Sequence, residues 1–440
     1  MGKPIVAIIR YQKPLDSVRK AVDLCHGLDH LPTKAKVFIK PNIVFWTKEV
    51  PFPKWGVVTT SRVVEDIVIL LKERGIDDIT IGEGMVSIKR RDRETPAHAF
   101  KALGYQVLKK RYGIKYINLL ERGFDAVDLG TGIALNFNTD ILNSDFVVNL
   151  PVLKTHAQAV VSLGIKNLKG TIDINSRKLS HSAAPKQDLH YHISRLANAM
   201  PPMLVLLDGI YTNERGPSFD GRIRRSNLLI ASADILSADK VGAKVLGHDP
   251  SAVPHLVHAA QDRGRPLDFS DIEIMGEPIE SVFSYHEYDF PYNAAGNLPL
   301  AMEKIGIRGL SYPKYDHTLC TYCSGLNWII LSAIAQAWKG EPWDDVEILT
   351  GKIMKPTPGK KKTILMGKCM YEAHRNHPDI QEMIPVKGCP PSPPAIANAL
   401  QRAGIDVDPE IFENIEKAPG FFMKRYKDRP EFQESFFTVQ

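Results

Sequence analysis

Residues 63–84 read VVEDIVILLKERGIDDITIGEG, and this stretch decides the fold class. From Val63 to Arg74, apolar residues recur at the i, i+3, i+4 and i+7 spacing of an amphipathic helix, and Gly75 is a good helix terminator. Ile79-Thr-Ile81 then predicts a short strand that runs into the turn Gly82-Glu83-Gly84. A helix followed at once by a strand is the repeating unit of parallel sheets whose faces are covered by helices.

The same alternation extends along the chain in both directions from this stretch. Further strands are predicted at residues 5–9, 37–40, 145–150, 203–207 and 228–231, and further helices at 96–103 and 235–246. We therefore expect an α/β domain with a mostly parallel sheet over residues 1–310. Near Gly306 the pattern changes, and residues 311–440 predict a smaller C-terminal α/β domain that ends in a tail lying on the surface or on a partner.

Composition and charge exclude several classes of protein. Apolar residues make up 44% and charged residues 24% of the 440, which is ordinary for a folded globular chain. No apolar run reaches the roughly 18 residues that a membrane-spanning helix needs, and the N-terminal run is too short for a signal peptide. The net charge of +6 is mild and scattered, so nucleic acid is not implied, whereas anionic small molecules are favoured. We expect a cytoplasmic protein.

Five cysteines in such a chain argue against a disulfide framework. Cys25 stands apart in a segment of helical periodicity, which indicates a buried structural thiol. The other four are Cys320 and Cys323, two residues apart, then Cys369 after 45 residues and Cys389 after a further 19.

These four thiolates suffice to ligate a cubane cluster or a tetrahedral zinc ion. Cys320 and Cys323 begin a predicted helix, and prolines follow Cys389, as happens after cluster cysteines. Zinc ligands usually come as two close pairs, whereas Cys369 and Cys389 are widely spaced. The pattern therefore favours a [4Fe–4S] cluster, with zinc as the alternative. Full ligation by protein favours electron transfer or a structural role over substrate binding at iron.

The densest polar segment runs from Asn149 to Gly170 and contains Lys154, His156, Lys166 and Asn167 within an apolar frame. Burial lowers the pKa of a lysine and makes it a usable acid, base or anion clamp. The alternative interpretation is a helix with exposed lysines and a histidine satisfied in the core.

Three predicted strands end in polar or glycine-containing turns, at Lys40-Pro-Asn42, Gly82-Glu83-Gly84 and Asp208-Gly209. In open α/β sheets, ligands bind at the carboxyl ends of strands, beside a switch in strand order. We expect these turns and the loop after Leu150 to converge there. His181, His190 and His192 form a second polar stretch, compatible with a site role or with metal binding.

The turns at Lys40-Pro-Asn42 and Gly82-Glu83-Gly84, with Lys154-Thr-His156 and Gly164-Ile-Lys-Asn-Leu-Lys-Gly170, together resemble the family called domain of unknown function 362. The resemblance covers roughly residues 35 to 250, and the segment Val386-Lys-Gly-Cys389-Pro-Pro resembles its iron–sulfur-bearing members. It implies the fold and the cluster more than any activity, because no common reaction is established for the family.

A second, fainter resemblance is to the nickel-pincer lactate racemases. By that alignment His156 would match a catalytic or ligand histidine, and Lys166 the lysine that holds the pincer cofactor. This chain departs from the pattern, with Gly164-Ile165 in place of Gly-Gly and Glu83 in place of a further histidine. We infer a shared scaffold and no nickel.

The leading functional interpretation is an iron–sulfur oxidoreductase or electron-transfer enzyme that acts on a small anionic organic substrate. The predicted catalytic residues are His156, Lys166 and Glu83, and the predicted substrate-binding residues are Lys40, Asn42, Lys154, Asn167 and Asp208. A redox partner protein and a homodimer are both compatible with this interpretation. The alternatives are a non-catalytic electron carrier or assembly factor, and a racemase-like or lyase-like enzyme with a structural cluster.

Overall fold

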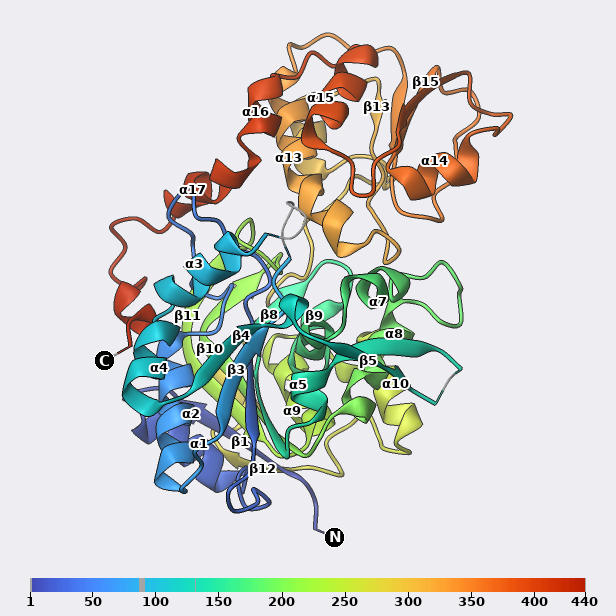
Figure 1. Cartoon of the computed structure of the whole chain (residues 1–440). Coiled ribbons are helices and arrows are strands. Elements are labelled where there is room, and N and C mark those ends of the chain that lie inside the picture. The colour runs from blue at the N-terminus through green and yellow to red at the C-terminus, as the bar shows by residue number, and fades with distance from the viewer. Residues whose placement is uncertain (1, 87–91, 131, 440) are drawn as a thin grey trace. The chain divides into compact units, whose positions relative to one another are not determined.

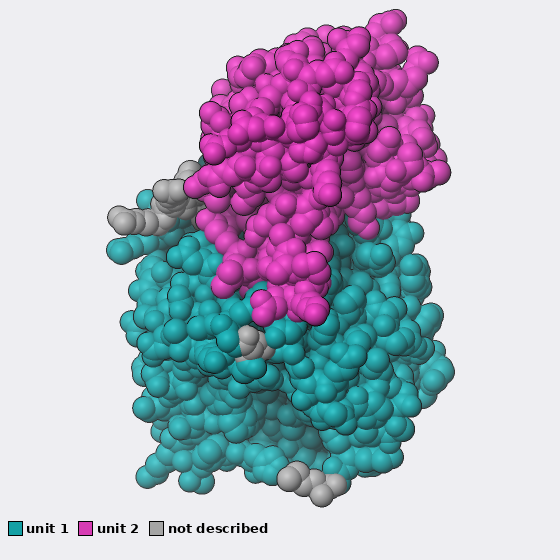
Figure 2. Space-filling model, turned by 90° about the vertical axis from the view of Figure 1, so that its right-hand side faces the viewer, with its two compact units in different colours: residues 1–177, 190–289, 419–440 teal, residues 178–189, 290–418 magenta. Residues whose placement is uncertain are grey.

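The computed structural model describes residues 2–86, 92–130 and 132–439 (Figure 1). Its contacts divide the chain into two compact units, coloured separately in Figure 2. The first unit comprises Met1–Arg177, His190–Asp289 and Pro419–Gln440, and the second comprises Lys178–Leu189 and Phe290–Ala418.

The first unit is built on a large mixed sheet. Along its main path the strands are β12 (Glu273–Gly276), β1 (Ile5–Arg10), β11 (Arg222–Ser232), β10 (Met203–Glu214), β7 (Phe146–Leu150), β2 (Val37–Pro41), β3 (Ile79–Glu83) and β4 (Lys115–Asn118), while β8 (Val152–His156) pairs with β10 and β9 (Val160–Ser162) with β8. Antiparallel pairing joins β1 to β11, β11 to β10 and β8 to β9, and the other neighbours are parallel. The predicted mostly parallel α/β sheet is confirmed.

Strands β2 and β7 lie in the interior of this sheet, and all five residues of each are buried. Their nearly continuous apolar sequences suit strands that are covered by helices on both faces. The predicted helix at 63–74 is α2 (Ser61–Glu73), and Gly75 follows it with φ +75°. The remaining helices and strands of this unit are α1 (Asp16–Leu24), α3 (Glu94–Ala102), α4 (Tyr105–Tyr112), β5 (Phe124–Asp128), β6 (Ala134–Asn138), α5 (Thr139–Leu142), α6 (Gly164–Asn167), α7 (Ile174–Leu179, which crosses into the second unit), α8 (Leu189–Arg195), α9 (Ile235–Val245), α10 (Pro254–Asp262) and α11 (Ile279–Val282).

Strand order reverses between β2 and β7. From β2 the chain moves outward to β3 and then β4, and it returns to β7 on the other side of β2. The carboxyl ends of these strands carry the turns that the sequence marked as polar. This is the position at which open α/β sheets place their binding sites.

One predicted strand end is wrong. The sequence predicts that the strand from Met203 stops at Asp208-Gly209, whereas β10 continues to Glu214 with a shift in register between Gly209 and Tyr211. A glycine within a strand often marks such an irregularity, and it reads like a turn in sequence. At Gly209 an added Cβ would lie 2.9 Å from the Leu228 carbonyl oxygen, so the close approach of β11 requires the glycine.

The second unit has its own parallel sheet. Its strands are β13 (Leu310–Ser311), β14 (Val346–Leu349), β15 (Lys362–Met366) and β16 (Glu382–Val386), and its helices are α12 (Leu300–Lys304), α13 (Thr321–Ala337), α14 (Lys368–His374), α15 (Pro393–Arg402) and α16 (Pro409–Glu413). Leu349, Leu365 and Met370 form a buried core cluster. The unit is therefore a small α/β body in its own right.

The boundaries of the two compact units differ from the predicted domain boundary at residue 310. The segment 419–440, which includes most of α17 (Ala418–Met423), belongs to the first unit. The Phe432 and Trp55 ring centroids lie 5.6 Å apart, and Tyr211 donates a hydrogen bond to the Glu431 carbonyl at 2.9 Å. Aromatic burial thus attaches the tail to the first unit. Among the described residues, no helix has the length and apolar character needed to cross a membrane.

Candidate functional site

A buried ion pair joins the carboxyl ends of β2 and β3. The Lys40 Nζ lies 2.9 Å from Glu83 Oε2, with side-chain exposures of 0% and 2%. Glu83 also accepts hydrogen bonds from the backbone N–H groups of Ile43 and Gly84, both at 2.7 Å. Burial lowers the Lys40 pKa, and Glu83 opposes that shift. Both predicted residues are therefore occupied with one another and with the backbone.

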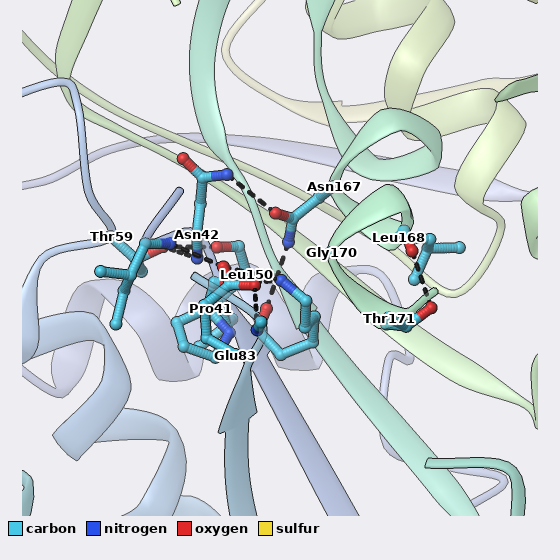
Figure 3. Close-up of polar contacts among 12 residues, drawn as sticks. Pro41, Asn42, Thr59, Glu83, Leu150, Asn167, Leu168, Gly170 and Thr171 are labelled. Carbon is cyan, nitrogen blue, oxygen red and sulfur yellow. Dashed lines mark hydrogen bonds and ion pairs between the residues drawn. The ribbon is translucent and has the colours of Figure 1, made fainter. Parts of the chain in front are cut away.

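A chain of side-chain amides links β2, β7 and α6 (Figure 3). The Asn42 amide nitrogen donates to Asn167 Oδ1 at 3.0 Å, and the Asn167 amide nitrogen donates to Asn149 Oδ1 at 2.8 Å and to the Lys40 carbonyl at 3.2 Å. The Asn42 N–H donates to Thr59 Oγ1 at 2.8 Å, and that hydroxyl donates to the Leu150 carbonyl at 2.6 Å. These residues fix the strand ends to one another.

Lys154 is the cation of β8 and is only 1% exposed. Its ammonium donates to Asn42 Oδ1 at 2.7 Å and to the Val57 carbonyl at 2.8 Å. Burial, and then the charge of Lys166, lowers the Lys154 pKa to about 7. The structure thus brings together five of the predicted site residues, namely Lys40, Asn42, Glu83, Lys154 and Asn167.

Lys166 differs from the other two lysines because it is partly exposed. In the part of the chain that the structure describes, its ammonium has no hydrogen-bond or ion-pair partner. Burial lowers the Lys166 pKa to about 7. Near neutral pH this amine can therefore exchange a proton or hold an anion.

The short helix α6, which carries Lys166, is pinned at its start by Asp239 of α9. The Asp239 carboxylate accepts the N–H groups of Gly164 and Ile165 at 2.7 and 2.8 Å, satisfying donors that a helix start leaves open. Burial raises the Asp239 pKa to about 7. Asn167 fastens the other end of the helix through the amide chain, so the backbone of Lys166 is held from both sides.

Sequence reasoning missed the buried His255 of α10. It is 0% exposed, and neither of its ring nitrogens has a hydrogen-bond partner. Its ring lies parallel to that of His190, with centroids 6.2 Å apart. Burial lowers its pKa well below the usual value, and His190 and Lys166 add to that shift. The spacing of His255 and His258, on one face of a helix, was the signal available in the sequence.

Other predicted residues lie in separate hydrogen-bonded settings. Asp208 accepts the N–H of Thr60 at 2.7 Å and that of Ile210 at 3.1 Å, and burial raises its pKa to about 6. His156 ends β8, and its Nδ1 accepts the Gln158 N–H at 3.1 Å. Of the three histidines of the second polar stretch, His190 and His192 belong to the first unit and His181 to the second.

Arg177 was also missed. Its guanidinium donates to the carbonyls of Gly84 and Gly170 at 2.8 and 2.7 Å, and so ties the turn after β3 to the segment after α6. Gly170 packs against the ion pair itself, because an added Cβ there would lie 2.6 Å from Glu83 Oε1 and 2.8 Å from Lys40 Nζ.

The four C-terminal cysteines all lie in the second unit. Cys320 caps α13 and Cys323 lies in its first turn, while Cys369 is in α14, directly after β15, and Cys389 follows β16. Adjacent parallel strands thus deliver two of the thiols to one edge of the sheet. The turn after β15 approaches the α13 pair, because an added Cβ at Gly367 would lie 3.9 Å from Cys323 Sγ.

The thiols are also electrostatic neighbours of one another. A hydrogen bond with Cys320, then burial, and then the proximity of Cys320, Cys389 and Cys369 raise the Cys323 pKa. None of the five cysteines, all of which are described, forms a disulfide, and Cys25 is buried as predicted. Within residues 2–86, 92–130 and 132–439, no group of three or more His, Cys, Asp or Glu side chains is arranged to hold a metal ion.

Comparison with known proteins finds similarity to a curated protein and to a solved structure. The Thylakoid-associated protein sll1697 of Synechocystis sp. is 28% identical over 230 residues, which are 52% of this chain and 67% of that protein. The lactate racemase apoprotein of Thermoanaerobacterium thermosaccharolyticum superposes with a TM-score of 0.35 at 16% identity, covering 57% of this chain and 58% of the racemase chain. The predicted family resemblance is confirmed: residues 37–244 match the model of the family described as Domain of unknown function (DUF362).

Proposed function

We propose that this protein is an iron–sulfur oxidoreductase or electron-transfer enzyme whose substrate is a small organic anion. The observation that supports the cluster assignment is that Cys320, Cys323, Cys369 and Cys389 act on one another electrostatically within the second unit. Four thiols from a helix start and two strand ends match the ligand set of a [4Fe–4S] cluster. Such a cluster, when bound, supplies one-electron transfer.

The arrangement of the thiols supports the cluster in two further ways. Cys320 and Cys323 occupy the N-terminal end of the 17-residue α13, where the helix dipole stabilises negative charge on thiolates. The Cys369 thiol is exposed to solvent, and Cys320, Cys323 and Cys389 are partly exposed, so iron and sulfide can reach them. Thiols outside disulfides also suit a reducing compartment such as the cytoplasm.

The first unit supplies the substrate site of the proposal. Lys166, without a partner and with its pKa near 7, is the group best placed to bind an anion or move a proton. An electron carrier without a substrate needs no such amine, so this observation favours an enzyme over the carrier alternative. The buried network of Lys40, Glu83 and Lys154 holds the surrounding strand ends in place. Electrons would come from a redox partner protein.

The cluster is tested by iron and sulfide analysis of protein purified without oxygen. We expect about four irons per chain and a broad absorption near roughly 400 nm that dithionite bleaches. Cys389→Ser should lose iron, whereas Cys25→Ala, which removes the one thiol outside the set, should retain it. A folded, colourless wild-type protein that carries zinc, or full iron in Cys389→Ser, would overturn the assignment.

A further inference from the structure

We propose that a cavity at the end of β1 binds the phosphate group of a small organic phosphate ester. The cavity has a volume of about 230 Å³, and every residue that lines it belongs to the first unit. None of the residues assigned to the cluster or to the substrate site, all of which are described, lines this cavity. The inference therefore goes beyond the proposed function and concerns a second anion site.

The last residue of β1, Arg10, lines the cavity together with Ser281. Its guanidinium donates to the Ser281 carbonyl at 2.8 Å and lies 3.3 Å from Glu277 Oε2. Both members of that ion pair are exposed, and such surface pairs are weak, so Glu277 competes little with a ligand. Among the described residues the Arg10 Nη1 group has no acceptor, which leaves it available to an anion.

Arg224 of β11 contacts the same part of the lining, the segment 281–286. Its Nη1 donates to Ser284 Oγ at 3.4 Å and to the Tyr285 carbonyl at 3.3 Å. Its Nη2 pairs with Glu214, a carboxylate that also pairs with Arg222 at 3.2 Å. The contacts of Arg10 and Arg224 thus bring two guanidiniums to one short segment of the cavity wall.

A chain of hydrogen bonds fixes that segment. A carbonyl only accepts, so His286 Nδ1 donates to the Ser284 carbonyl at 2.7 Å, and His286 Nε2 accepts the Thr212 hydroxyl at 2.8 Å. Thr212 in turn accepts the Ser226 hydroxyl at 2.7 Å. Burial lowers the His286 pKa, which keeps the ring neutral in this chain. The wall is therefore held in place before a ligand binds, which reduces the entropic cost of binding.

The charge of the lining selects an anion. Of the described residues that line the cavity, three are arginines and none is an aspartate or a glutamate. The third arginine, Arg225, donates to the neutral oxygen atoms of Asn227 and Tyr211. Guanidiniums bind phosphate oxygens through paired, charge-assisted hydrogen bonds, and several of them suit a dianion better than a monovalent carboxylate. The lining therefore favours a phosphate group.

The remainder of the lining is largely apolar, and it favours an ester over free phosphate. Leu153, Leu228 and Leu246 are buried there, whereas Phe283 is 51% exposed. An organic group bound against the Phe283 ring would bury apolar surface on both sides. Cavities for drug-sized ligands have volumes of about 300–1,000 Å³, so about 230 Å³ suits a small ester better than a nucleotide.

Isothermal titration calorimetry of the full chain tests this site without an activity assay. Phenyl phosphate, inorganic phosphate and benzoate are titrated at equal ionic strength and about pH 8, where a phosphate monoester with a second pKa of about 6 is a dianion. We expect phenyl phosphate to bind at least about tenfold more tightly than benzoate, which carries the same ring and one charge. It should also bind more tightly than inorganic phosphate, which lacks the ring.

Arg10→Gln should weaken the binding of phenyl phosphate by about tenfold or more, because charge-assisted hydrogen bonds are lost. Arg19→Gln is the matched control, since Arg19 also forms an exposed ion pair, with Glu73, and this variant should bind like wild type. Phe283→Ala should weaken the binding of phenyl phosphate but not of inorganic phosphate. Phe421→Ala, which removes another exposed ring, should affect neither.

Equal binding of benzoate and phenyl phosphate, or wild-type affinity in a folded Arg10→Gln variant, would overturn the phosphate site. Inorganic phosphate that binds as tightly as phenyl phosphate would overturn the ester. If Arg10→Gln does not fold, the ranking of the three anions and Phe283→Ala decide. Lys166→Met should bind phenyl phosphate like wild type, so failure of the proposed substrate site leaves this cavity standing. Loss of binding in Lys166→Met with Arg10→Gln unchanged would overturn the cavity alone.

Discussion

The Lys40 ammonium and the Glu83 carboxylate lie 2.9 Å apart, and almost no part of either side chain is accessible to solvent. The pair joins the carboxyl ends of β2 and β3, beside the point between β2 and β7 at which strand order reverses. Breaking a buried ion pair by removing one partner is strongly destabilising, because a charge is left without compensation. The pair is therefore more important to the shape of the site than to ligand binding.

Glu83→Gln should lower the free energy of unfolding by about 3–5 kcal/mol, because it leaves Lys40 buried without its counter-charge. Urea denaturation followed by circular dichroism measures the change. The exposed Glu280→Gln is the matched control and should stay within about 0.5 kcal/mol of wild type. The double variant Lys40→Met with Glu83→Gln should recover part of the loss, and no recovery would contradict the ion-pair explanation.

Lys166 should make the stability of the protein depend on pH in the alkaline range. Its pKa is about 7 in the folded chain, against 10.5 for an ordinary lysine, so the folded state binds fewer protons than the unfolded state between these values. Lys166 therefore makes the free energy of unfolding increase as pH rises from about 7 towards 10.5. Lys166→Met should flatten that rise in urea titrations, whereas Lys20→Met should not. Equal slopes in wild type and Lys166→Met would exclude the lowered pKa.

Asp239 should make the stability of the protein depend on pH in the opposite direction. Its pKa is raised from 3.8 to about 7, so the folded state binds more protons than the unfolded state in that window, and stability falls as pH rises through it. Asp239→Asn should remove this dependence and cost about 1 kcal/mol as a cap of α6. Urea denaturation at several pH values between about 4 and about 8, which spans the two pKa values, measures both effects. Exposed Asp125→Asn is the control, and a wild-type pH dependence in Asp239→Asn would contradict the assignment.

Gly170→Ala should destabilise the first unit by about 1–3 kcal/mol, because the new methyl group would meet Glu83 Oε1 at 2.6 Å and Lys40 Nζ at 2.8 Å. The denaturation midpoint measures the loss. Gly2→Ala, where nothing lies within 4 Å, should leave the midpoint unchanged. An unchanged denaturation midpoint in Gly170→Ala would show that the ion pair can shift to admit the methyl group without loss of stability.

The parts of the fold that the sequence predicted well are those with a strong local period. Helix α2 and strand β3 follow directly from the spacing of apolar residues between Val63 and Ile81. The extension of β10 beyond Gly209 could not be predicted, because a glycine within a strand and a glycine in a turn look alike in sequence. Whether the second unit holds an iron–sulfur cluster stays a prediction.

The site was predictable to the extent that its residues are polar within an apolar frame. That pattern identified Lys154 and Lys166, and the strand ends identified Lys40 and Glu83. The pairing of Lys40 with Glu83 depends on which strands become neighbours, so local sequence does not contain it. His255 was missed for the same reason, since the ring parallel to its own, that of His190, lies in another helix, α8.

The segment 419–440 packs against the first unit after the chain has passed through the second, and this order has a consequence for biosynthesis. These residues are synthesised after the second unit, so Trp55 and Tyr211 cannot pack against Phe432 until the whole second unit has been translated. The second unit can therefore fold while the first is still incomplete. A chain that ends at residue 418 would leave those aromatic rings uncovered, which makes premature termination a route to aggregation.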